Sequence, residues 1–68
     1  MSSDAQRAIQ IIQDNEPVQD LEVNGSVLSF KLRGADYTFS ELELELLGAA
    51  DRIGIHDAWE NWAHNEGL

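Results

Sequence analysis

Cysteine is absent from this chain, and basic residues are scarce, with only four among its 68 residues. Without cysteine, the chain forms no disulfide and no thiolate zinc site. Its uninterrupted apolar runs are short, whereas a membrane-spanning helix needs roughly 20 apolar residues. So few bases also give little attraction to anionic lipid. We therefore expect no role at a membrane.

The start of the chain lacks the basic and apolar regions of a secretory signal peptide. Met1 is followed by Ser2, Ser3 and Asp4, which are small or acidic. A secretory signal needs a positively charged segment and then an apolar one. We therefore expect a cytoplasmic protein.

Thirteen acidic residues against four basic ones give a net charge of -9. This charge would repel a phosphate backbone instead of releasing its counterions, so direct nucleic-acid binding is not expected. Three explanations of the acidity remain: general solubility, a saline cytoplasm, or a protein partner with a basic surface.

The hydrophobic content of 43% is close to that of globular proteins, so we expect the chain to fold. A domain of this size buries roughly 60% of the surface that its unfolded chain exposes, which leaves little room for a deep cleft. The expectation is one domain covering residues 1–68.

The first half of the chain predicts a helix and two hairpins. Ser3-Asp4-Ala5-Gln6 has the form of a capping box, and apolar residues follow it at helical spacing, which predicts a helix from residue 3 to about 15 that Pro17 stops. Asn24-Gly25 predicts a type I′ hairpin turn with Leu21 opposite Leu28, and Gly34-Ala35 predicts a type II′ turn with Phe30 opposite Phe39. The result is a three-stranded antiparallel meander. Its inner face is expected to carry Leu21, Val23, Leu28, Phe30, Leu32, Tyr37 and Phe39, and its outer face Asp20, Glu22, Lys31 and Arg33.

A second helix is predicted from Ser40, where Ser40-Glu41-Leu42-Glu43 forms another capping box. Phe39 before the cap and Leu44 at the fourth helical position can form a hydrophobic staple. The apolar stripe of this helix is expected to consist of Leu42, Leu46, Ala49, Ala50 and Ile53. Leu44 and Leu47 lie outside the centre of that stripe, so they either widen the buried face or are exposed for a partner.

Gly54 is expected to end or kink the second helix, and Asp57-Ala58-Trp59-Glu60 offers a capping box for a last helix that runs to about Asn65. The alternative is one long bent helix. The predicted fold class is α+β: an N-terminal helix, a three-stranded antiparallel β-meander, and one or two C-terminal helices packed on one face of the sheet.

Few residues suggest catalysis or metal binding. His56, Glu60 and His64 recur at every fourth position, which on one helix would align three zinc-ligand side chains. A fourth ligand is missing, and such a stripe is more often a solvated polar face, so no cofactor is expected. The five glycines are interpreted as turn and helix-end residues and not as a phosphate-binding loop. We therefore expect a protein that is not an enzyme.

Trp59 and Trp62 lie three positions apart in the last predicted helix. One interpretation is that they cover a small core against the sheet, because a tryptophan buries roughly 150 to 250 Å². The other is an exposed aromatic anchor for a partner. Both hold if one ring faces inward and the other outward.

The acidic second helix provides the main functional hypothesis. Its carboxylates are either simply solvated or they face a partner with a basic groove, where they could imitate a phosphate array. The sequence thus suggests a non-enzymatic acidic module that binds, and inhibits, a larger protein with a nucleic-acid site. The candidate partner-binding residues are Glu41, Glu43, Glu45, Asp51, Leu44, Leu47, Trp59 and Trp62. Alternatives are a self-associating structural or regulatory subunit that forms a homodimer, and a small metal-binding protein.

Overall fold

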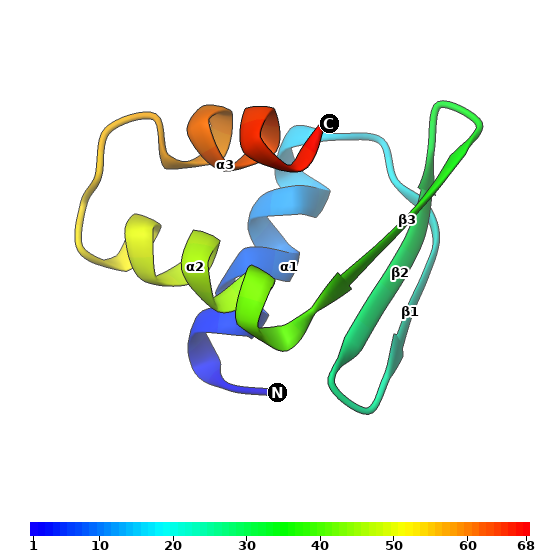
Figure 1. Cartoon of the computed structure of the whole chain (residues 1–68), viewed down its shortest axis with the longest axis horizontal. Helices are drawn as coiled ribbons and strands as arrows, with labels where there is room; N and C mark the ends of the chain where they lie inside the picture. Colours follow the sequence, from blue (N-terminus) through cyan, green and yellow to red (C-terminus); the bar gives the residue numbers. More distant parts are fainter.

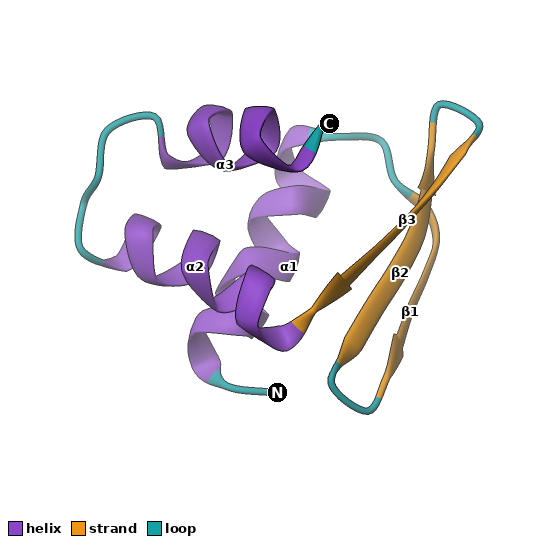
Figure 2. Ribbon diagram, viewed as in Figure 1, coloured by secondary structure: helices purple, strands orange, loops and turns teal.

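A helix, three strands and two further helices follow one another along the chain in the computed structural model, which describes residues 1–68 (Figure 1). The elements are α1 (Ser3–Asn15), β1 (Gln19–Asn24), β2 (Val27–Leu32), β3 (Ala35–Ser40), α2 (Glu41–Arg52) and α3 (Ala58–Glu66). All three helices lie on one side of the sheet, and the other side is uncovered (Figure 2). The predicted α+β fold class is confirmed.

The helix α1 begins one residue earlier than its predicted cap requires. Ser2, and not Ser3, is the N-cap, and its hydroxyl accepts a hydrogen bond from the Ala5 backbone N–H at 3.2 Å. Ala5 is also one of the residues that α1 buries. The helix ends at Asn15, because Glu16 precedes Pro17 and adopts the extended conformation that a following proline favours.

The strands form an antiparallel sheet in the order β1-β2-β3, which is the predicted meander. The pairing differs from the predicted one: Leu28 lies opposite Val23 on one side, and Phe30 lies opposite Tyr37 on the other. Both differences amount to two residues. Because side chains alternate with a period of two along a strand, an even shift leaves each side chain on its predicted face.

The two turns explain this shift, because each lies one residue from its predicted position. The first is Gly25-Ser26, where only the glycine has positive φ (63°), the φ pattern of a type II′ turn. The second is Arg33-Gly34, where both residues have positive φ (49° and 82°), as in a type I′ turn. The predicted turn types are therefore exchanged.

Buried apolar side chains from α1, β2, β3, α2 and α3 form one cluster between the sheet and the helices. The sheet contributes Leu28, Phe30, Leu32 and Phe39 to it. Leu21 and Tyr37 of the predicted inner face are half-buried, but Val23, near the first turn at the end of β1, is exposed. Val23 thus shares the face of its cross-strand partner Leu28, as predicted, but it is not part of the buried core.

The second capping box is present. The Ser40 hydroxyl accepts from the Glu43 backbone N–H, and the Glu43 carboxylate accepts from the Ser40 backbone N–H at 3.1 Å. The chain then turns at Gly54, which has φ of 80°, and α3 is a separate helix. Its predicted capping box is wrong: Asp57 has φ of 59°, makes no side-chain cap bond, and lies 3.2 Å from His56 Nε2 instead.

Candidate partner-binding face

The helix α2 carries apolar side chains on two opposite faces. Leu44 and Leu47 are fully buried on the inner face. Gly48, between them and Arg52, lies so close to α1 that a Cβ atom there would overlap the Asp4 carbonyl oxygen. The expectation that Leu44 and Leu47 serve as partner anchors is therefore wrong, because burial in the core keeps them from any partner.

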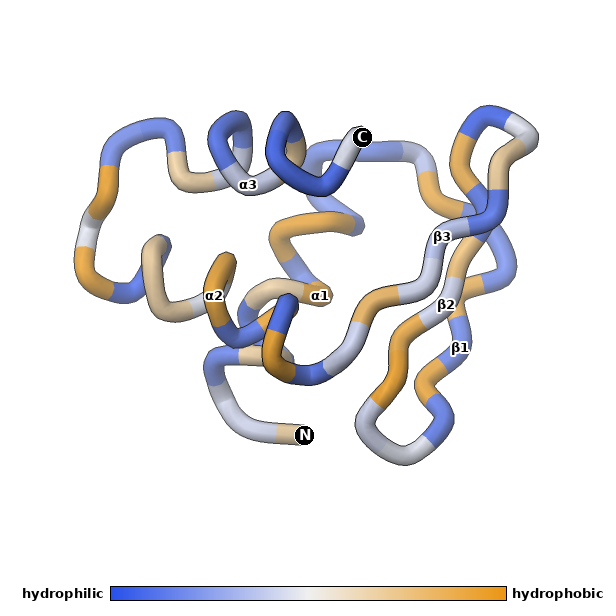
Figure 3. The backbone as a smooth tube through the Cα atoms, viewed as in Figure 1, coloured by the Kyte–Doolittle hydropathy of each residue, from blue (hydrophilic) through white to orange (hydrophobic).

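The opposite face of α2 and the segment after it expose four large apolar side chains, which we call the outer stripe. Their exposed fractions are 75% for Leu42, 68% for Leu46, 65% for Ile53 and 49% for Ile55. Figure 3 shows apolar positions along α2 and in the loop that leads to α3. The prediction that Leu42, Leu46 and Ile53 lie on the buried face of this helix is therefore wrong.

A groove of about 450 Å³ lies beside the outer stripe, between α2 and α3. Its apolar lining is Leu46, Ala50, Ile55, Ala58 and Trp62, and its polar lining is Asn61, Asn65 and Glu66. The outer stripe and the groove share Leu46 and Ile55. They therefore form one continuous apolar surface, which we call the α2–α3 face.

Trp62 fixes the position of α3 against α2. It is buried, its ring centroid lies 5.0 Å from that of Phe39, and its indole N–H donates to the Glu43 carbonyl oxygen at 3.0 Å. This satisfies the polar atom that a buried tryptophan carries. Trp59 is half-buried and its ring centroid lies 6.0 Å from that of Trp62. Trp62 therefore belongs to the core and also contributes to the groove lining.

Three of the four predicted acidic partner residues of α2 make contacts within the chain. Glu41 accepts from the Ser2 backbone N–H at 3.0 Å, Glu43 belongs to the capping box, and Asp51 pairs with Arg7 at 3.0 Å. Glu45 is half-buried and makes no such contact. The carboxylates of α2 are therefore held partly by the fold itself.

Every arginine is neutralised within the chain. Arg7 pairs with Asp51 at 3.0 Å, and two similar pairs, at 2.9 and 3.0 Å, join Arg33 to Glu16 and Arg52 to Asp4. Of thirteen acids and four bases, these three pairs leave ten acids and one base, Lys31. The charge that remains for contacts outside the chain is thus almost entirely negative.

A pair of carboxyl groups lies where α2 meets α3. The Ser40 backbone N–H lowers the pKa of Glu43, with a smaller contribution from Glu66. Burial raises the pKa of Glu66, and the neighbouring negative charge and hydrogen bond of Glu43 raise it further. Because the two side chains share a hydrogen bond, Glu66 holds its proton more tightly than a solvated glutamate does.

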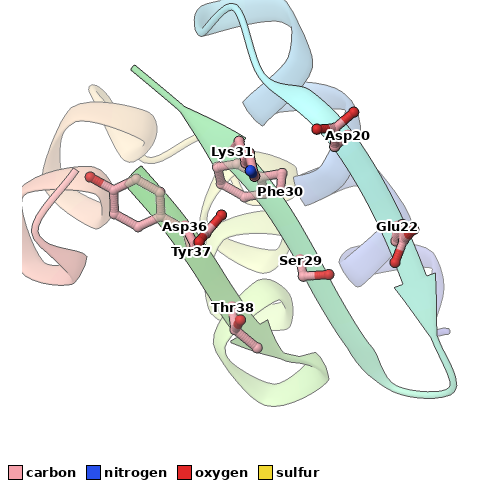
Figure 4. A pocket seen from close by; sticks show the side chains of 8 residues that line it. All are labelled: Asp20, Glu22, Ser29, Phe30, Lys31, Asp36, Tyr37 and Thr38. Carbon is pink, nitrogen blue, oxygen red and sulfur yellow. The ribbon is translucent and has the colours of Figure 1, made fainter. Parts of the chain in front are cut away.

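A second hollow, of about 340 Å³, lies on the uncovered face of the sheet (Figure 4). Its polar lining comes from all three strands: Asp20, Glu22, Ser29, Lys31, Asp36 and Thr38. Asp20, Glu22 and Lys31 thus lie on the outer face, as predicted, and Lys31 is opposite Asp36 in the sheet register. Neither hollow contains a histidine, the side chain most often used as a catalytic base.

The predicted metal-ligand stripe is not formed. His56 precedes α3, which begins at Ala58, so it does not share a helix face with Glu60 and His64. No group of three or more histidine, aspartate or glutamate side chains in the structure is arranged to hold a metal ion. The geometry on which the zinc hypothesis depended is therefore missing.

Comparison with protein-family models, curated proteins and solved structures finds no match to this chain. None of its helices is long and apolar enough to cross a membrane.

Proposed function

We propose that this protein is a non-enzymatic interaction module that binds a larger protein with a basic surface, and that the α2–α3 face makes the contact. The observation that carries the proposal is the exposure of Leu42 and Leu46 on one face of α2 and of Ile53 at its C-cap. Isolated exposed leucines are ordinary, but a contiguous apolar patch beside a groove is typical of a protein-binding surface.

The charge of the protein supports a basic partner. Outside the three arginine pairs, the protein carries ten carboxylates and one lysine. A partner of opposite charge would be steered toward the protein, and the apolar contacts of the α2–α3 face would then slow its dissociation. A nucleic-acid-binding protein is one class of such partner, and inhibition by occupying its binding site is the corresponding action.

A symmetric homodimer is the second candidate, because the same outer stripe could bury itself against a second copy. The affinities of the two interactions respond differently to salt. Charge-steered binding weakens as salt rises, whereas an apolar dimer is held or strengthened.

The proposal is tested by affinity capture from the native host lysate at low and high salt, with Leu46→Asp as the test variant. Leu46 is exposed, so this change leaves the core intact. The matched control is Val23→Asp, which removes an exposed apolar side chain of β1 and adds the same charge away from the α2–α3 face.

We expect a basic protein that is captured at low salt, released by high salt, lost with Leu46→Asp and retained with Val23→Asp. Glu45→Lys should weaken the capture without loss of fold, because Glu45 makes no hydrogen bond within the chain. A captured protein that is indifferent to salt and to Leu46→Asp would contradict the proposal. Capture of the protein itself alone would favour the homodimer.

A further inference from the structure

From the shape and charge of the α2–α3 face we infer its occupant: an amphipathic helix of the partner, with apolar side chains on one side and lysine or arginine along its edges. This inference rests on the proposed function and specifies the structure of the partner segment. Binding of an amphipathic helix in an apolar groove is a common mode of peptide recognition.

The length of the surface fits a helix. Leu42, Leu46 and Ile53 are spaced by four and seven residues, so these three residues of the outer stripe follow one line along α2 to its C-cap. At a rise of 1.5 Å per residue, Leu42 and Ile53 lie about 16 Å apart along the axis. A helix of about three to four turns covers this length, and its own leucine-type residues at helical spacing would meet the stripe and the groove.

The walls of the groove also suit a helix as the occupant. The groove of about 450 Å³ is bounded by α2 on one side and α3 on the other. Its wall on α3 carries two exposed amides, Asn61 and Asn65, one helical turn apart. A helix lying between α2 and α3 would place a line of apolar side chains in the groove and its polar flank beside these amides.

The charges around the surface call for a basic occupant. Glu66 lines the groove, and Glu45 lies on the flank of α2 away from α3, 60° around the helix from Leu42 toward Glu41 by the 100° step per residue. The arginine of α2, Arg52, is already paired with Asp4 at 3.0 Å. A bound helix with basic edges would therefore find a carboxylate on each side and no competing positive charge.

The same charges disfavour a second copy as the occupant. A two-fold interface brings the same patch of each copy together, so Glu45 and Glu66 of one copy would approach those of the other. Each copy carries a net charge of -9 and no unpaired arginine to offset that repulsion. The same carboxylates would attract a basic helix, whereas they would repel a second copy of the chain.

The inference is tested with synthetic peptides of about sixteen residues, a length of about four helical turns. The test peptide has leucines at helical spacing and lysines elsewhere. One control peptide contains the same residues in an order without an apolar face, and a second replaces every lysine with glutamate. Binding to the full chain is measured by fluorescence anisotropy, and the contact surface by NMR shifts of the labelled protein.

The decisive variant is Leu46→Glu, because it removes an apolar contact and adds a negative charge. Charge alone would make a lysine-rich peptide bind more tightly to this variant. We expect it to bind at least about tenfold more weakly, which would show that Leu46 contributes by apolar contact. Val23→Glu adds the same charge on β1 and should leave the affinity unchanged or slightly higher.

The inference predicts that the amphipathic basic peptide binds, that both control peptides bind at least about tenfold more weakly, and that NMR shifts gather at Leu46, Ile55 and Asn61. Equal binding of the two lysine-rich peptides would overturn it, because binding would then need charge only. Equal binding of the glutamate peptide would overturn its electrostatic part. A dimer that Leu46→Glu converts to a monomer would replace the basic helix with a second copy.

These outcomes are separable from the proposed function. A salt-sensitive partner that is captured from the lysate and lost with Leu46→Asp, together with peptides that do not bind, would leave the proposed function standing and remove the helical occupant. If no such partner is captured and the peptides do not bind either, the proposed function and the helical occupant are both contradicted.

Discussion

Leu44 and Leu46 lie two positions apart in α2, yet one is fully buried and the other is 68% exposed. In a helix, two positions correspond to a rotation of about 200°, so the two side chains point in nearly opposite directions. Chemically identical residues thus occupy different environments, and truncating each of them tests stability and the proposed binding separately.

We predict that Leu44→Ala lowers the free energy of unfolding by about 2 to 5 kcal/mol, because it leaves a cavity in a packed core. Leu46→Ala should change it by less than about 0.5 kcal/mol, since the side chain is already in water. Urea denaturation of the two variants measures both values. Equal losses of stability would contradict the assignment of Leu46 to a binding surface.

A pH dependence follows from the carboxyl pair at the junction of α2 and α3. The pKa of Glu66 is raised in the folded chain, so proton binding there stabilises the fold at low pH, and this contribution is lost as the pH rises through the raised pKa. The lowered pKa of Glu43 acts in the opposite direction, with stability that is present at neutral pH and lost on acidification. At neutral pH, the ionised form of Glu66 therefore opposes folding.

Glu66→Gln should consequently raise the melting temperature at neutral pH by about 1 to 3 °C, a shift typical of relieving one like-charge surface contact in a small domain. The gain should vanish near about pH 3, where glutamate is itself neutral. Glu60→Gln removes the same charge from an exposed position of α3 and serves as the control. Equal gains from both variants would attribute the effect to net charge and not to the pair.

At the scale of elements, Gly48 decides which face of α2 is buried. A glycine inside a helix costs about 1 kcal/mol relative to alanine, so its presence there needs a reason. Here the absence of a side chain lets the α1 backbone at Asp4 approach α2 closely. Leu44 and Leu47, which lie near this contact, are fully buried in the core.

Gly48→Ala therefore sets two effects against each other. Helix propensity alone would stabilise the protein by about 1 kcal/mol. Overlap of the new methyl group with the Asp4 backbone should cost more, and we predict a net destabilisation of about 1 to 3 kcal/mol, because backbone atoms cannot rotate away as a flexible side chain can. Thermal unfolding gives the sign directly, and a stabilised variant would show that α1 and α2 are packed less closely than described.

The order and type of the elements could be predicted from the sequence because their signals are local. The Ser40–Glu43 capping box, Pro17 after α1 and the glycines near both hairpins each act within a few residues, and each correctly locates a helix end or a turn region. Exact turn positions were missed by one residue, because Asn24-Gly25 and Gly25-Ser26 are both acceptable two-residue loops.

The outer stripe could not be predicted by periodicity, because α2 has apolar residues on both faces. Leu42, Leu46 and Ile53 form the more regular stripe, and regularity favours a buried face. Two signals pointed the other way: the staple between Phe39 and Leu44 directs Leu44 toward the sheet, and Gly48 marks a close helix contact on the same side. Burial depends on which element packs against the helix, and that information is not local.

At the scale of the whole molecule, the arginines are paired with carboxylates of the same chain, and the unpaired charges that remain are almost all negative. The three arginine pairs connect distant parts of the chain, two between α1 and α2 and one between the end of α1 and the second turn. Each is exposed to solvent and contributes at most about 1 kcal/mol. The ten remaining carboxylates repel one another over the surface of a domain with a radius of gyration of only 11.0 Å.

Screening should therefore stabilise this protein. We predict that raising NaCl from about 20 to about 300 mM increases the melting temperature, because it weakens the repulsion among many carboxylates more than it weakens three exposed ion pairs. Calorimetry at fixed pH measures the change. A fall in the melting temperature would show that the arginine pairs dominate the electrostatic free energy of folding.

The central claim is that the α2–α3 face binds a partner, and methyl NMR of the protein in complex with its captured partner tests it most directly. Leucine and isoleucine methyl groups report on the exposed outer stripe, the buried core and the sheet in one spectrum. We predict that Leu42, Leu46, Ile53 and Ile55 lose solvent contact and shift, while the amides of Ser29, Lys31 and Thr38 on the uncovered sheet face stay unchanged. Shifts confined to the sheet face, with the outer stripe unaffected, would contradict the account.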